Sequence, residues 1–89
     1  MADMELNATP RLAPGCRLHP TQDVLLVPEG ALSLQGPARE ILAQLDGKQT
    51  VSGVVDELCK QYPGAVANEL QQDVVSLLER MEQRGVVRV

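Results

Sequence analysis

Aromatic residues are almost missing from this chain of 89 residues, which contains no Trp, no Phe and a single Tyr, Tyr62. Its hydrophobic core must therefore be aliphatic. Modules that bind single-stranded nucleic acid stack bases on aromatic rings, and this composition excludes such a platform. The net charge of −4 also repels the phosphates of nucleic acids and of anionic membranes. The composition thus favours a peptide or a protein as the binding partner.

Residues that carry catalysis or bind metals are equally scarce. His19 is the only histidine, and Cys16 and Cys59 are too far apart for a C-x-x-C motif. Cys59 falls on an apolar helical stripe, where a thiol acts as a small hydrophobe. The sequence also lacks the G-x-x-x-x-G-K pattern of a phosphate-binding loop. We therefore expect neither enzymatic activity nor a bound cofactor or metal ion.

Targeting signals are missing as well. The sequence shows no signal peptide and no apolar run of about 18 residues, the length needed for a membrane helix. With its two cysteines far apart, the chain is expected in the reducing cytoplasm. Its length has room for one domain. We expect residues 1–9, which lack periodicity, to form a flexible N-terminal segment and residues 10–89, from Pro10 onward, to form a single domain.

A β-hairpin is predicted around Pro28-Glu29-Gly30, a sequence typical of a tight turn. Its arms are residues 24–27 and 31–34, and residues 16–19 provide a third antiparallel strand. In the last strand, Leu32 and Leu34 share the buried face, whereas Ala31 and Ser33 take the other. The outer edge of so small a sheet leaves backbone N–H and C=O groups unpaired, which suits the addition of a guest strand.

Three amphipathic helices should follow the hairpin. Each has apolar residues spaced by three and four positions, and a glycine follows each stripe: Gly47, Gly64 or Gly85. The expected helices cover residues 37–45, about 51–62, and 68–84.

Polar residues predict where the later helices begin. Thr50 is the expected N-cap of the second helix, and Asn68 that of the third, with Gln71 three positions later as in a capping box. The C-terminal residues 86–89 fit either an extended segment or a tail.

Taken together, the sequence predicts an α+β fold that is winged-helix-like, with a three-stranded antiparallel sheet followed by a three-helix bundle. In such domains the second and third helices can bind DNA. Residues 51–84 carry six acidic and three basic side chains, however, and a recognition helix should be basic. We therefore expect a winged-helix-like architecture in a protein that does not bind DNA.

A family resemblance extends from Pro10 to the C-terminus. It rests on Pro10-Arg11-Leu12, Leu26-Val27-Pro28-Glu29-Gly30, Leu32-Ser33-Leu34, Ile41-Leu42, Leu45-Asp46-Gly47, Thr50-Val51, Asp73-Val74 and Leu77-Leu78. The order and spacing of these motifs resemble those of the PqqD family, small peptide chaperones of pyrroloquinoline quinone (PQQ) biosynthesis. They also resemble those of the wider class of precursor-peptide recognition domains. It departs at Leu45, where the family often has Cys, and at Gln35-Gly36, where Asn is common.

The resemblance implies a non-catalytic function. Members bind the ribosomal precursor peptide PqqA and present it to the radical SAM enzyme PqqE. In related domains the peptide lies as an extra strand beside the third strand and against the third helix. The peptide-binding residues expected here are Ala31, Leu32, Ser33, Leu34, Gln71, Val75, Leu78 and Glu82.

Val75 carries the specific part of that expectation. It points away from the centre of the apolar stripe, so it is either the margin of a wide core or the floor of a peptide groove. Glu79 and Glu82 nearby would favour a peptide that carries Lys or Arg.

The alternative function is a small acidic protein-interaction or dimerisation module of winged-helix type without DNA binding. The open edge of the sheet could pair with a second copy and form a homodimer. The sequence alone leaves both functions open.

Overall fold

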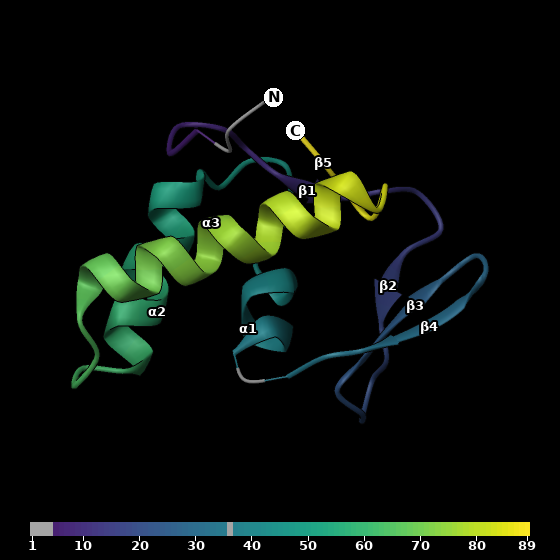
Figure 1. Ribbon diagram of the computed structural model, residues 1–89, viewed down its shortest axis with the longest axis horizontal. Helices are drawn as coiled ribbons and strands as arrows, with labels where there is room; N and C mark the ends of the chain where they lie inside the picture. Colours follow the sequence, from purple (N-terminus) through teal and green to yellow (C-terminus); the bar gives the residue numbers. More distant parts are fainter. Residues whose placement is uncertain (1–4, 36) are drawn as a thin grey trace.

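The computed structural model describes residues 5–35 and 37–89. Three helices pack together, a three-stranded sheet lies at one end of them, and a two-stranded sheet lies near both termini (Figure 1). In chain order the elements are β1 (Arg11–Leu12), β2 (Arg17–Leu18), β3 (Val24–Val27), β4 (Gly30–Ser33), α1 (Ala38–Ala43), α2 (Val51–Gln61), α3 (Ala67–Gln83) and β5 (Val87–Arg88).

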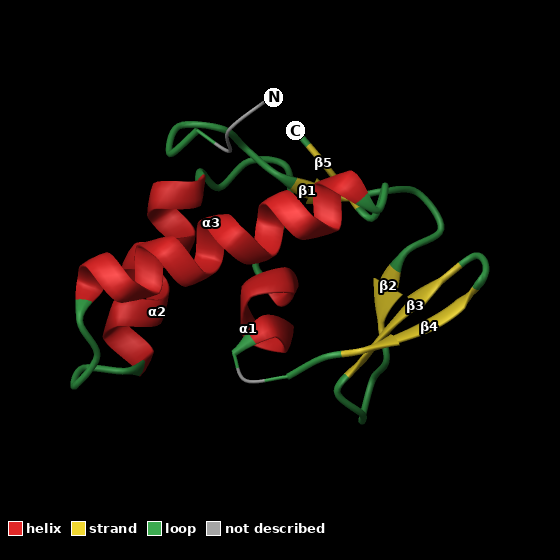
Figure 2. Ribbon diagram, in the orientation of Figure 1, coloured by secondary structure: helices red, strands yellow, loops and turns green. Residues whose placement is uncertain are grey.

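The three-stranded sheet confirms the predicted hairpin. Its strands are antiparallel in the order β2-β3-β4 (Figure 2), and Leu25 faces Leu32 across the β3–β4 pair. Val27 pairs with Gly30, so Pro28 and Glu29 alone form the turn. Strand β4 begins one residue earlier than expected and ends at Ser33, although the next residue still bonds to the loop before β3. The alternation is as predicted, with Leu32 and Leu34 turned inward and Ala31 and Ser33 exposed.

Helix α1 is shorter than expected, ending at Ala43 instead of residue 45. The N–H groups of Gln44 and Leu45 bond to carbonyls three residues earlier, which tightens and closes the last turn. Asp46 then holds the connection to α2, because its Oδ1 accepts hydrogen bonds from the N–H groups of Lys48 and Gln49, both at 2.8 Å. The expected end of the sheet at Gly36 lies outside the described residues.

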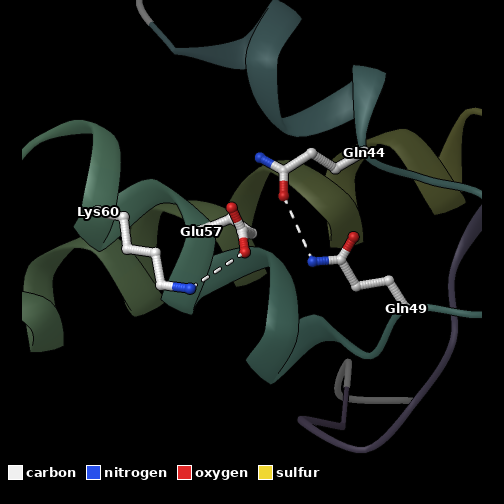
Figure 3. Close-up of polar contacts among 4 residues, drawn as sticks. All are labelled: Gln44, Gln49, Glu57 and Lys60. Atoms are coloured by element: carbon white, nitrogen blue, oxygen red, sulfur yellow. Dashed lines mark hydrogen bonds and ion pairs between the residues drawn. The ribbon is translucent and has the colours of Figure 1, made fainter.

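Helix α2 follows the prediction closely. The hydroxyl of Thr50 accepts a hydrogen bond from the N–H of Gly53 at 3.0 Å, as expected of an N-cap. Side-chain amides of Gln49 and Gln44 meet at 3.5 Å beside its start, and Lys60 pairs with Glu57 on its exposed face (Figure 3).

The predicted start of α3 was wrong. The helix begins at Ala67, and its N-cap is Val66, whose side chain cannot accept a hydrogen bond. Asn68 and Gln71 thus lie inside the helix and form no capping box. The predicted end is confirmed: Gly85 has φ +79°, and the N–H groups of Gly85 and Val86 bond to the carbonyls of Glu82 and Met81. This is the double hydrogen bond of a Schellman motif.

The C-terminal segment is extended, not a loose tail. Strand β5 pairs antiparallel with β1, with Leu12 opposite Val87, and Val86 and Val87 are buried. Residues 1–4 of the expected flexible segment lie outside the described residues. The carbonyls of Leu6 and Ala8 accept hydrogen bonds from the N–H groups of Ser52 and Val51. The boundary between residues 9 and 10 stays a prediction.

The core is aliphatic, as the composition requires. Leu25 from the sheet, Ile41 from α1, Leu58 from α2 and Leu78 from α3 are at most 1% exposed and belong to one cluster. Cys59 is half-buried and packs against that cluster. Burial of these side chains from all three helices fixes α3 against α2 and α1. Within the described residues, no helix is long and apolar enough to cross a membrane.

Candidate functional site

The outer edge of β4 is open along its whole length. In the sheet β4 pairs only with β3, and no other described strand lies on its far side. The N–H of Leu34 donates to the carbonyl of Asp23 at 2.8 Å, toward β3. Successive residues of a strand direct their backbone groups to opposite edges, so Leu32 also bonds inward, whereas Ala31 and Ser33 direct N–H and C=O to the open edge. These two residues can hydrogen-bond a guest strand.

A groove lies between this edge and the C-terminal half of α3. It has a volume of about 310 Å³. Its lining residues come from β4, the two residues after it, the start of α1, and α3 with its C-cap: Leu32, Ser33, Leu34, Gln35, Ala38, Leu77, Arg80, Met81 and Arg84. An extended peptide paired with Ser33 would direct alternate side chains toward α3.

The groove has an apolar floor and a basic wall. Leu34 and Leu77 are buried and Met81 is half-buried, whereas Arg80 and Arg84 are exposed. None of the described residues that line it is acidic. It can therefore bury apolar side chains and attract carboxylates.

A second hollow of about 200 Å³ continues the groove past Gln35. It shares Gln35, Ala38, Leu77 and Arg80 with the first and adds Pro37, Ile41, Asp73 and Ser76. The two hollows form one path between the β4–α1 segment and α3.

The sequence-predicted site is brought together only in part. Residues 31–34 lie at the open edge, as expected, but the helix residues lie elsewhere. Leu78 is fully buried in the core and offers no surface to a ligand. Gln71 and Val75 line a third hollow with Gln72 and Ser76, and this hollow shares only Ser76 with the second one.

The two flanks of α3 explain this division. At about 100° per residue, Val75 and Arg80 lie on opposite sides of the buried stripe. Val75 is half-buried and packs against the core from its margin. Glu82 lies on the Val75 flank and does not line the groove. The charged side chains that line the groove beside β4 are Arg80 and Arg84, and Glu79 and Glu82 do not line it.

Leu77, Arg80, Met81 and Arg84 line this groove but were not among the residues expected from the sequence. A usable signal was present, because Arg80 and Arg84 are four residues apart and border the apolar stripe of α3. The choice between the two flanks needs the position of the sheet, which the helical periodicity does not contain.

The single histidine forms hydrogen bonds that stabilise a turn. Nδ1 of His19 accepts hydrogen bonds from the N–H groups of Thr21 and Gln22, both at 3.1 Å, and so closes the turn between β2 and β3. Across the described part of the chain, no three potential metal-ligating side chains gather into a cluster.

Comparison with known proteins gives the family. The family model described as "Coenzyme PQQ synthesis protein D (PqqD)" matches residues 23–87. The chain belongs to the PqqD family. Its relatives include a protein of Stutzerimonas stutzeri named "PqqA binding protein", 36% identical over 89% of this chain and 88% of that protein. Another of the same name, from Acinetobacter baylyi, is 39% identical over 94% of this chain and 86% of that protein.

A solved structure shows the same fold. The solution NMR structure of the PqqD truncation of Methylobacterium extorquens PqqCD matches with a TM-score of 0.76 and 31% identity, over 90% of this chain and 88% of that one. That truncation represents a functional, stand-alone recognition element for a ribosomally synthesised and post-translationally modified peptide. The α+β prediction, with a three-stranded antiparallel sheet and three helices, is confirmed. The PqqD match begins in the turn before β3 and extends to β5, so it includes both walls of the groove.

Proposed function

We propose that this protein is a non-catalytic peptide chaperone of PQQ biosynthesis, which binds the precursor peptide PqqA as a fourth strand on the open edge of β4. Family membership and relatives named for PqqA binding support the ligand. The observation that carries the binding mode is the outward direction of the backbone groups of Ala31 and Ser33 beside the groove.

Strand addition separates affinity from selectivity. Each backbone hydrogen bond contributes about 0.5–1.5 kcal/mol net and holds any extended peptide. Preference for one peptide must come from the side chains of the groove, where Leu77 and Met81 offer apolar contact. Residues 31–34 are thus retained from the sequence-predicted site, and the Gln71, Val75 and Glu82 flank is the competing surface.

The test is an isothermal titration of the full chain with synthetic PqqA, using the wild type, Ser33→Pro and Ser33→Ala. Proline at position 33 removes an N–H that points to the open edge and leaves the β3–β4 hydrogen bonds in place. We expect Ser33→Pro to weaken binding about tenfold or more and Ser33→Ala to bind as the wild type. Circular dichroism melting checks that both variants remain folded.

Two results would contradict the proposal. Failure of PqqA to bind the wild type would reject the ligand. Equal affinity of Ser33→Pro and the wild type would reject strand addition at β4. An NMR titration then identifies the surface, since shifts at Leu77 and Met81 indicate the groove, whereas shifts at Gln71 and Val75 indicate the other flank.

The assembly around the chaperone is part of the same proposal. Delivery of the bound peptide to the radical SAM enzyme PqqE requires the complex to leave another face free, and the α2 side of the bundle is remote from β4 (Figure 1).

The free thiols of Cys16 and Cys59 are compatible with a reducing cytoplasm.

A homodimer through β4 would compete with the peptide. Such a dimer pairs the open edge with its own copy, so PqqA should shift the protein to monomer in light scattering. A dimer that persists at saturating PqqA is closed through another surface.

A further inference from the structure

The path between β4 and α3 is electrically polarised. Arg84 lines only the hollow beside β4, Asp73 lines only the hollow beside Pro37, and Arg80 lines both. All three charged side chains are exposed, and the floor between them is apolar. A peptide in this path therefore meets Arg84 at one end, Arg80 between the two hollows and the carboxylate of Asp73 at the other end.

The spacing of the two arginines matches a strand. Four helical residues span about 6 Å along the axis, and alternate residues of a strand are about 6.6–6.8 Å apart on the same face. Side chains at positions i and i+2 of a guest strand can therefore each face one of the two guanidinium groups. Arginine binds carboxylates with two parallel hydrogen bonds, which favours Asp or Glu at both positions.

The direction of the guest strand follows from topology. Leu32 and Ser33 line only the first hollow, as do Met81 and Arg84. Pro37 lines only the second hollow, as does Asp73, so β4 and the start of α1 pass α3 in the direction opposite to its own. A guest that continues the antiparallel sheet runs opposite to β4. Its N-terminal part then lies near Asp73 and its C-terminal part near Arg84.

We propose that this groove selects an acidic-x-acidic segment whose two carboxylates face Arg80 and Arg84, in a peptide that enters antiparallel to β4, with a basic side chain favoured upstream, beside Asp73. The inference rests on the proposed function and adds the sequence chemistry and polarity of the peptide. It replaces the expectation, based on Glu79 and Glu82, that the peptide is basic where it meets α3.

The experiment is a set of double-mutant cycles with the full chain. Synthetic PqqA peptides, each with one Asp or Glu replaced by its amide, are titrated into the wild type, Arg80→Gln and Arg84→Gln. Arg17→Gln is the matched control, because Arg17 is an exposed arginine on β2, at the opposite edge of the same sheet. Melting curves verify that each variant is folded.

We expect two carboxylates of PqqA that lie two positions apart to show coupling, each to one of the two arginines. In each cycle the non-additive change in the dissociation constant should be about threefold to tenfold, and neither carboxylate should couple to Arg17. Wild-type affinity should fall with rising salt more steeply than that of the double variant Arg80→Gln/Arg84→Gln. If wild-type protein binds PqqA but every arginine–carboxylate pair is additive, the charge selection is wrong and the proposed function stands. If PqqA does not bind at all, both fall.

Polarity is tested separately with a spin label at either end of PqqA. The C-terminal label should broaden amide signals around Arg84 more than those around Asp73, and the N-terminal label should do the reverse. The opposite pattern would overturn the antiparallel orientation while leaving binding at the groove intact.

Discussion

The hydroxyl of Tyr62 donates a hydrogen bond to the carboxylate of Glu40 and thereby joins the end of α2 to α1. This bond, more than burial or the negative charge of Glu40, raises the pKa of the Tyr62 phenol above its ordinary value of 10.0.

Tyr62 is the only aromatic residue, so its ionisation is the only phenolate signal in ultraviolet absorbance. We expect the folded protein to titrate above 10.0 and the Glu40→Gln variant to titrate closer to that value. Because the folded state favours the neutral phenol, the associated stability is complete below the ordinary pKa and is lost as pH rises through the raised one. Identical titrations of the two proteins would show that the bond is not formed in solution.

Asp46 has the opposite pH dependence. Hydrogen bonds from the N–H groups of Gln49 and Lys48 lower the pKa of its carboxyl below 3.8. The folded state favours the carboxylate, so its stabilising effect is present above the ordinary pKa and is lost as pH falls through the lowered one. Urea unfolding at pH 6 and near pH 3 measures this effect. Between these two pH values, the free energy of unfolding should fall more for the wild type than for Asp46→Asn. Equal losses would contradict the role of the loop carboxylate.

Burial separates two apolar residues of α3 that the sequence placed in one site. Leu78 is fully buried, and Leu78→Ala should lower the free energy of unfolding by about 2–5 kcal/mol. Val75 is half-buried at the margin, and Val75→Ala should cost about 1 kcal/mol or less. Urea unfolding measures both. Comparable costs would mean that Val75 is a full member of the core.

Local signals predicted the elements whose causes are local. The hairpin turn, the Thr50 cap and the Gly85 stop each depend on residues within a few positions, and all three are confirmed. The predicted start of α3 was wrong because Asn68 has the sequence features of an N-cap, whereas the helix already includes Ala67, one residue earlier.

The remaining features depend on tertiary contacts. Strands β1 and β5 have two residues each and no periodicity, and they pair because the ends of the chain meet beside α3. The groove likewise exists only where β4 lies against α3. The helical pattern identified the buried stripe correctly but not which flank borders the sheet, so Val75 was favoured and Arg80 was overlooked.

Gly85 positions the C-terminal strand. Its φ of +79° lets the chain reverse after α3, so that Val86 and Val87 reach the core and β5 reaches β1. A side chain at this position would meet no atom within 4 Å, so the cost of Gly85→Ala is the backbone conformation alone, about 1–2 kcal/mol.

Gly64 is the matched control, since a side chain there also meets nothing within 4 Å and its φ lies outside the left-handed range. We expect Gly64→Ala to leave stability unchanged or raise it slightly by restricting the unfolded chain, while Gly85→Ala lowers the urea midpoint. Gly85→Asn should lie between the wild type and Gly85→Ala, because asparagine tolerates this conformation better than alanine. Equal midpoints for Gly64→Ala and Gly85→Ala would show that the turn after α3 does not depend on a left-handed residue.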